Sequence, residues 1–224
     1  MKKFITITFG LLILSLSLTG QSNGFTTLLD ENIEYVVDMI YGSDDQLIVA
    51  GYHEGFVNYI TALDNNGEIE WSHEFYGEIL WFADIVQKAN GNVLIPMSRF
   101  HAILLELNHL GDSVGSIISI DSAKSFFGPL TKFSDSLIFC PKIVMNTEPF
   151  FTSVDQSFIV RIFNNVIEEI HASQVHNILD LTVSNDNSLF ALAVNNDVSA
   201  YTHIVKYNLQ GEILNTGTCA DMDP

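Results

Sequence analysis

A strand, a short polar turn and a strongly apolar second strand recur four times along this 224-residue chain, and this repeat limits the folds open to it. The second strands begin at four equivalent apolar positions, Leu47, Val93, Leu137 and Leu189. These positions are 46, 44 and 52 residues apart. Further apolar segments predict a third and a fourth strand in each copy. We therefore predict four repeat units, at about residues 33–76, 80–120, 127–170 and 176–217.

Short strands dominate the sequence. They have four to seven residues, are rich in Ile, Val, Phe and Tyr, and alternate with polar turns, whereas helical periodicity is nearly absent. Four strands per unit and a period in the forties are typical of a propeller blade. We predict an all-β fold in which residues 23–224 form a β-propeller-like array of about four four-stranded antiparallel blades, either closed or incomplete. A β-sandwich pair is the alternative.

One turn is especially informative. Asn66-Gly67 favours a tight hairpin because both residues tolerate positive φ. Weaker copies of this turn occur in units two and four, at Asn108–Asp112 and Asn208–Glu212, whereas unit three has Asn164-Asn165 and no glycine. We expect Trp71, which closes the first of these hairpins, to pack between blades.

The segment Ile60–Trp71 leads from an apolar strand through Leu-Asp and a glycine turn to a closing Trp. This arrangement resembles the repeat of quinoprotein-like (PQQ-type repeat) β-propellers. Together with Asp45–Gly51, it is also similar to blades of secreted bacterial surface proteins. The resemblance covers about residues 33–217 and implies a propeller, although Gly115 and Asn215 stand where units two and four would have the aromatic. Because the ligand set of a quinone-dependent dehydrogenase is missing, we predict no quinone cofactor.

The N-terminus has the three parts of a secretory signal peptide. Basic residues Lys2 and Lys3 precede an apolar run from Phe4 to Leu18, and small and polar residues follow. We predict a signal peptide over residues 1–22, with cleavage near Gly20 to Ser22, and a secreted product in the periplasm or outside the cell. No later segment is apolar and long enough to span a bilayer, so we predict no membrane span after cleavage.

The chain is strongly acidic. It has 9 Lys and Arg against 27 Asp and Glu, a net charge of −18. Such a surface repels phosphate backbones, which argues against a nucleic-acid partner. We interpret the acidity as a source of solubility outside the cell, with weak calcium capture as the alternative.

Three carboxylates hold the same place in the first strand of units one, two and four: Asp38, Asp84 and Asp180. First strands lie nearest the centre of a propeller, so these side chains are candidates for a ring that binds a cation such as Ca²⁺ or a polar ligand. The alternative is a hydrogen bond made within each repeat. No nucleophile, phosphate-binding or zinc motif occurs, so we assign no catalytic residue.

A longer middle loop in unit three, residues 146–156, is the predicted interaction surface, because loops on rigid repeats carry function. Its central residues are Thr147, Glu148, Pro149, Phe150 and Phe151. Cys140 and Cys219 are a candidate disulfide that spacing does not decide.

Taken together, these features predict a secreted, non-enzymatic binding or scaffold protein of the bacterial envelope or exterior, with a protein or glycan partner. Self-association is expected if the blade edges are open, because an exposed apolar blade face exceeds what monomers normally tolerate. The alternative function is an extracellular polymer-acting hydrolase with its site on the propeller rim. The fold itself does not choose between the two.

Overall fold

The computed structural model describes residues 35–42, 45–53, 57–76, 84–98, 101–119, 124–145, 154–173, 176–195 and 202–218. Within these ranges the regular structure consists of β-strands, without an α-helix. The predicted signal peptide and the predicted interaction loop, Thr147 to Phe151, lie outside the described residues.

The strands form four antiparallel sheets, here called blades 1 to 4. Blade 1 contains β1 (Tyr35–Tyr41), β2 (Leu47–His53), β3 (Val57–Leu63) and β4 (Ile69–Tyr76). Blade 2 contains β5 (Val86–Gln87), β6 (Val93–Ser98), β7 (Ala102–Leu107) and β8 (Ser113–Ser119). Blade 3 contains β9 (Ser125–Phe127), β10 (Thr131–Ser134), β11 (Leu137–Met145), β12 (Val154–Phe163) and β13 (Val166–Ser173). Blade 4 contains β14 (His176–Val183), β15 (Leu189–Asn195), β16 (Thr202–Tyr207) and β17 (Ile213–Thr218).

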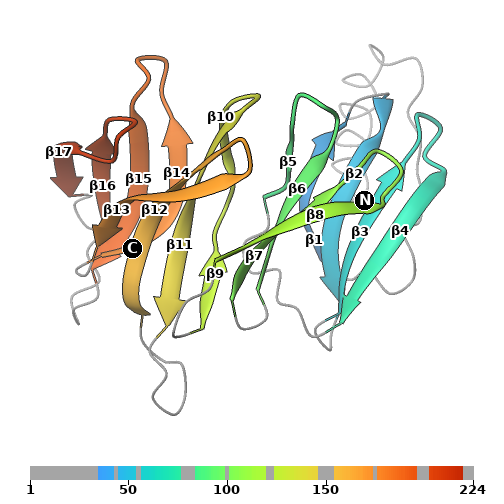
Figure 1. Ribbon diagram of the computed structural model, residues 1–224, viewed down its shortest axis with the longest axis horizontal. Helices are drawn as coiled ribbons and strands as arrows, with labels where there is room; N and C mark the ends of the chain where they lie inside the picture. Colours follow the sequence, from blue (N-terminus) through green and yellow to red (C-terminus); the bar gives the residue numbers. More distant parts are fainter. Residues whose placement is uncertain are drawn as a thin grey trace, which may run out of the picture.

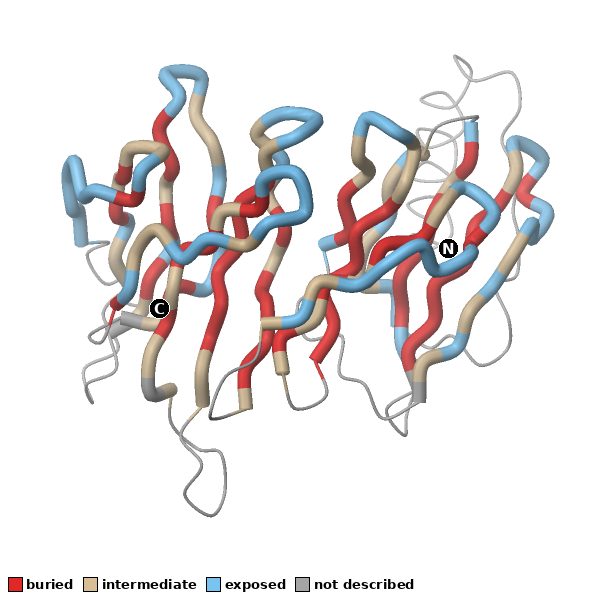
Figure 2. The backbone as a smooth tube through the Cα atoms, viewed as in Figure 1, coloured by how far each residue is buried: buried red, intermediate tan, exposed pale blue. Residues whose placement is uncertain are grey.

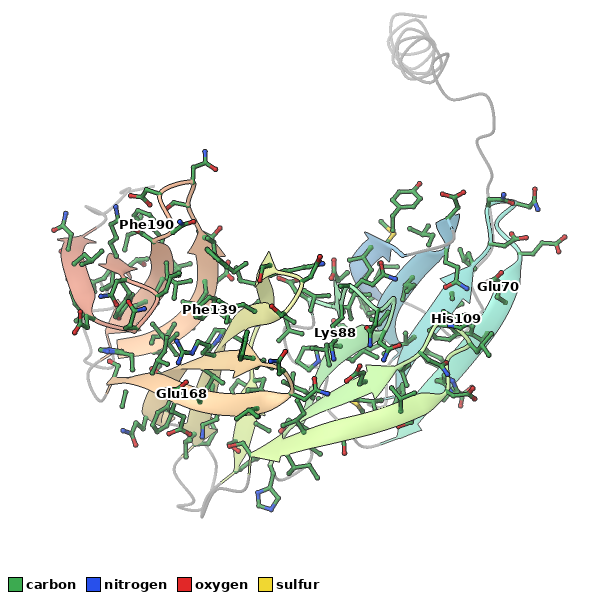
Figure 3. The ribbon with its side chains drawn as sticks, turned by 45° about the horizontal axis from the view of Figure 1, so that its top comes forward. Glu70, Lys88, His109, Phe139, Glu168 and Phe190 are labelled. Atoms are coloured by element: carbon green, nitrogen blue, oxygen red, sulfur yellow. The ribbon has the colours of Figure 1, made fainter. Side chains whose placement is uncertain are left out.

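The blades follow one another side by side, and each strand pairs with its neighbours in sequence order, except that β9 pairs with β11 and not with β10 (Figure 1). Their stacking gives a curved arc, with the first strand of each blade toward the inside and the last strand toward the outside (Figure 3). The predicted all-β, propeller-like fold is therefore confirmed. Four separate sheets exclude the β-sandwich pair.

Apolar cores fill the boundaries between successive blades. Core 1–2 contains Ile48 and Ala50 of blade 1 with Val93 and Ile95 of blade 2. Leu94, whose side chain points to the opposite face of β6, belongs to core 2–3 instead. The central strands are thus buried on both faces, while the turns are exposed (Figure 2). This explains why their sequences are apolar without alternation.

Core 3–4 completes a set of three, made of residues from blades 3 and 4. A closed ring of four blades needs a fourth boundary, between blades 4 and 1. The described residues form no core cluster there. The part of the array that the structure describes is therefore an open arc.

The repeat anchor predicted in unit three, Leu137, is wrong by one residue. Val93 and Leu189 pack toward the preceding blade, and the residue of blade 3 that does so is Ile138. The reason is a shorter first hairpin: β10 and β11 are joined by two residues, whereas five separate β14 from β15. Leu137 faces the other way, toward core 3–4.

The first strand of blade 3 is also divided in two. β9 and β10 both pair with β11, and the interruption between them contains Pro129. Proline has no N–H to donate to a ladder, which makes a continuous strand unfavourable here. The sheet begins at Ser125, two residues before the predicted start of the unit.

The hairpin turns are of two kinds. At Asn66-Gly67 only the glycine has positive φ, 83°, and the amide of Gly67 donates to the carbonyl of Asp64 at 3.0 Å. Gly111 and Gly211 repeat this geometry in blades 2 and 4. Blade 3 instead has Asn164-Asn165 with φ of 49° and 64°, the signature of a two-residue type I′ turn. Unit three lacks the glycine because its shorter, two-residue turn is formed by two asparagines with positive φ.

Trp71 packs against the following blade, as expected. Its indole Nε1 donates to the carbonyl of His109 at 3.0 Å. A Cβ added to Gly111 would lie 2.7 Å from the indole ring, so the turn of blade 2 and the Trp of blade 1 are in close contact. Trp71 is thereby tied to a turn that only glycine fits.

Candidate functional site

The first-strand carboxylate Asp38 bridges two blades. Its Oδ1 accepts the backbone N–H of Met39 at 2.7 Å, and its Oδ2 accepts that of Ile85, in blade 2, also at 2.7 Å. The pairing of β1 with β2 is irregular between Val36 and Asp38. A β-bulge of this kind re-aims the following side chain, which places the carboxylate toward the next blade.

Asp180 repeats the local part of this arrangement. Its Oδ1 accepts the backbone N–H of Leu181 at 2.7 Å, and a register shift between Ile178 and Asp180 precedes it. The hydrogen bond within the repeat, which was the alternative to a ligand-binding ring, is therefore present in blades 1 and 4. In blade 3 the equivalent position is held by Pro129, so no carboxylate completes the ring.

The three carboxylates are near enough to affect one another. Asp84 is exposed at the surface, but partial desolvation by its neighbours raises its pKa above the ordinary value, and the negative charges of Asp38 and Asp180 raise it further. Among the described residues, however, no group of three or more His, Cys, Asp or Glu side chains gathers closely enough to hold a metal ion. The candidates Asp38, Asp84 and Asp180 thus share an electrostatic environment but not a coordination sphere.

A crevice of about 350 Å³ opens where the turns of blades 2 and 3 meet. Its floor is apolar and consists of Leu94, Ile138 and Ile162. Its rim is formed by polar turn residues from three hairpins: Lys88, Asn90, Asp135, Ser136, Asn164 and Asn165. Lys88 lies near the middle of the arc (Figure 3). The crevice therefore offers hydroxyl, amide, carboxylate and ammonium groups around an apolar base.

A partly buried ion pair fixes one wall of this crevice. The Nζ of Lys88 lies 2.9 Å from Oε1 of Glu106 and donates to Oδ1 of Asn165 at 2.8 Å. Asn92 also donates to the Glu106 carboxylate, at 2.6 Å. Burial alone would raise the pKa of Glu106, but the hydrogen bonds from Asn92 and Lys88, with the charge of Lys88, outweigh it and lower the pKa. The network joins blades 2 and 3 and holds the turn Asn164-Asn165 in place.

A second hollow, of about 540 Å³, adjoins the first at Asn164. It is lined by Leu137, Arg161, Phe163, Asn164, Val166 and Glu168. Arg161 and Glu168 form an ion pair across β12 and β13, and the Phe163 ring is about half exposed. An exposed aromatic face beside a paired guanidinium and carboxylate is a surface on which a planar or ring-shaped ligand can stack.

Sequence reasoning did not find this crevice. Its residues lie in turns that have no motif, and they come together only because the blades stack with their turns at one edge. The usable signal was the concentration of Asn, Asp, Ser and Lys in the turns at residues 88–92, 134–136 and 164–165 of two adjacent units.

The remaining predictions concern single residues. Cys140 is a free thiol buried in core 2–3, and Cys219, its partner in the candidate disulfide, lies outside the described residues. Burial raises the pKa of the Cys140 thiol well above its ordinary value. None of the described segments forms a helix with the length and hydropathy needed to cross a bilayer.

No protein-family model matches the sequence, and no curated protein matches it either. Solved structures do resemble the fold. A protein of unknown function from Bacteroides caccae has a TM-score of 0.53 and 13% identity over 86% of this chain and 70% of its own. Lignostilbene dioxygenase from Pseudomonas brassicacearum has a TM-score of 0.55 and 11% identity, over 86% of this chain and 53% of its own. Puromycin hydrolase has a TM-score of 0.56 and 12% identity, over 87% of this chain and 31% of its own.

The chain thus spans about half and about a third of the two enzyme chains that it resembles. At such low identity the likeness shows the fold alone. It supports a propeller-like architecture and carries neither enzymatic activity over to this chain.

Proposed function

We propose that the protein is a secreted, non-enzymatic β-propeller-like binding protein of the bacterial envelope or exterior. Its ligand is rich in hydroxyl groups, such as an oligosaccharide. The observation that carries the proposal is the crevice between blades 2 and 3, in which polar turn residues surround an apolar floor. Few, convergent polar groups over an apolar surface are typical of small-ligand sites.

The chemistry of the rim favours hydroxyl groups. Asn90, Asn164 and Ser136 each provide both a donor and an acceptor, and Asp135 adds an acceptor. The exposed ring of Phe163, in the adjoining hollow, provides a stacking surface. Because the chain has a net charge of −18, a neutral oligosaccharide is favoured over an acidic one.

The location rests on the sequence. The N-terminal basic and apolar segments support export, and the resemblance of Ile60–Trp71 to quinoprotein-like propellers of secreted bacterial surface proteins supports the bacterial exterior. Expression of the full chain in a bacterial host, followed by cell fractionation and N-terminal sequencing, tests this part. Export with cleavage near Gly20 to Ser22 is expected, and an uncleaved cytoplasmic product contradicts it.

A printed array of neutral and acidic oligosaccharides tests the binding function. The wild type should bind neutral members, and Phe163→Ala and Asp135→Ala/Ser136→Ala should weaken that binding by about tenfold or more. Ile118→Ala, which truncates an equally exposed side chain in β8, is the matched control and should bind normally. Absence of any bound oligosaccharide refutes the proposal. New reducing ends on a bound oligosaccharide favour the hydrolase alternative.

A further inference from the structure

The face of blade 4 that points away from blade 3 is built like an internal blade boundary. In blade 1, Ala50 pairs with Ile60 across β2 and β3, and both side chains are fully buried in core 1–2. The same register in blade 4 places Leu192 opposite Ile204. These two side chains are 40% and 43% exposed. The apolar residues of a boundary are present here, although no described residue buries them as blade 2 buries Ala50 and Ile60.

The adjoining pair on this face is Phe190 and Lys206. The Lys206 ammonium lies 5.3 Å from the centre of the Phe190 ring and pairs with Asp186 at 2.7 Å. Phe190 marks this end of the arc in Figure 3. The lysine stem covers part of the aromatic surface but leaves Leu192 and Ile204 open.

The opposite end of the arc has the complementary kind of face. Met39 occupies the first-strand position that Ile85, Leu130 and Leu181 hold in the other three blades. Those three residues are buried against the preceding blade, whereas Met39 is 58% exposed. Blade 1 therefore presents the face that receives a preceding blade, and blade 4 presents the face that receives a following one.

We propose that these two faces bind each other between two copies of the chain, head to tail, so that blade 4 of each copy packs on blade 1 of the other. Because the two faces differ, the contact between copies is heterologous. Such contacts give a finite assembly only if the copies close into a ring. Two copies of four blades give eight, at the upper end of the usual range of about 4–8 blades, whereas three copies give twelve. The contact continues the three boundaries already present in each chain, and it lies at the ends of the arc, away from the crevice between blades 2 and 3.

Charge predicts how this assembly responds to salt. Each chain carries a net charge of −18, so two copies repel each other while their apolar faces attract. Added salt screens the repulsion and leaves the burial of apolar surface in place. The dimer should therefore become more stable as the salt concentration rises.

Sedimentation velocity of the purified exported protein, over a range of concentrations, tests the proposal. A mass of two chains at high concentration is expected. Leu192→Lys and Met39→Glu, each on its own, should weaken association by about tenfold or more, because each buries an unpaired charge. Combined in one chain, they should restore association at low salt, because every head-to-tail contact then pairs a lysine with a glutamate.

Leu110→Lys is the matched control, since Leu110 is also apolar and exposed but lies in the β7–β8 turn. It should leave association unchanged, and near-wild-type melting temperatures should show that all variants are folded. A monomer at every concentration and salt overturns the proposal. So does a dimer that is sensitive to Leu192→Lys but not to Met39→Glu, since that pattern indicates two blade 4 faces packed together.

Discussion

The carboxylate of Asp38 accepts the backbone N–H of Ile85 across the boundary between blades 1 and 2, at 2.7 Å. Ile85 is almost fully buried in core 1–2, so its N–H needs a partner. The carboxylate of Asp38, in the preceding blade, provides the acceptor, because β5 is short and begins only at Val86. A carboxylate predicted as a ligand-binding candidate thus serves as a connection between repeats.

This connection predicts the effect of Asp38→Ala. The substitution leaves the buried Ile85 amide without its acceptor, which should lower the free energy of unfolding by about 1–3 kcal/mol. Urea unfolding at neutral pH measures the difference. Asp135→Ala, which removes an exposed carboxylate paired with Lys132, is the control and should change stability by no more than about 0.5 kcal/mol. Equal losses for the two variants contradict the assignment.

Asp84→Asn should stabilise the protein at neutral pH. The pKa of the exposed Asp84 carboxyl is raised by partial desolvation and by the charges of Asp38 and Asp180, so its ionised form is disfavoured in the folded state. The contribution of the protonated group is fully present below the unfolded pKa of 3.8 and is lost as pH rises through the folded pKa. The melting temperature of Asp84→Asn should exceed that of the wild type at pH 7, and the advantage should vanish below pH 3.8. A lower melting temperature at pH 7 would count against this account.

Glu106 should behave in the opposite way. Its pKa is lowered, because hydrogen bonds from Asn92 and Lys88 outweigh burial, so the ionised form stabilises the fold. That contribution is present above the unfolded pKa of 4.5 and is lost as pH falls through the folded pKa. Glu106→Gln should therefore be less stable than the wild type at pH 7, with a difference that shrinks on acidification. Denaturant unfolding at several pH values measures it, and a pH-independent difference is the contrary result.

Gly111→Ala should disrupt the packing of Trp71. The glycine has a φ of 83°, and an added Cβ would lie 2.7 Å from the indole ring. We expect a loss of about 1–3 kcal/mol from backbone strain, with repacking of Trp71 in addition. Gly115→Ala is the matched control in the next strand, since its Cβ would meet no heavy atom within 4 Å. Thermal unfolding compares the two variants, and equal stability would show that the turn does not constrain Trp71.

The sequence was sufficient to predict the fold because the repeat is carried by several independent signals. The apolar second strands, such as Val93–Ser98, and the glycine turns at Gly67 and Gly211 agree on the same period. The displaced register of unit three was not predictable in this way. Leu137 and Ile138 are both apolar, and only the direction in which each packs tells them apart.

The candidate site was less predictable. The crevice depends on turns from two blades lying at one edge, which is a property of the stacking and not of any segment. The environment of Asp84 likewise depends on residues from two other blades, Asp38 and Asp180. The sequence identified these three carboxylates as equivalent, but the hydrogen bonds of Asp38 and Asp180 follow from bulged strands, and the effect of both charges on Asp84 follows from the stacking of the blades.

The three cores have no side chain in common among the described residues. In blade 2, Val93 and Leu94 are consecutive along one backbone, yet they belong to different cores. Among the described residues, adjacent cores are thus separated by a single layer of main chain, so a loss of packing in one core does not directly remove contacts from the next. Under mechanical load or in rising denaturant, the boundaries between blades should therefore open one at a time, and the loss of one blade should leave the remaining cores intact.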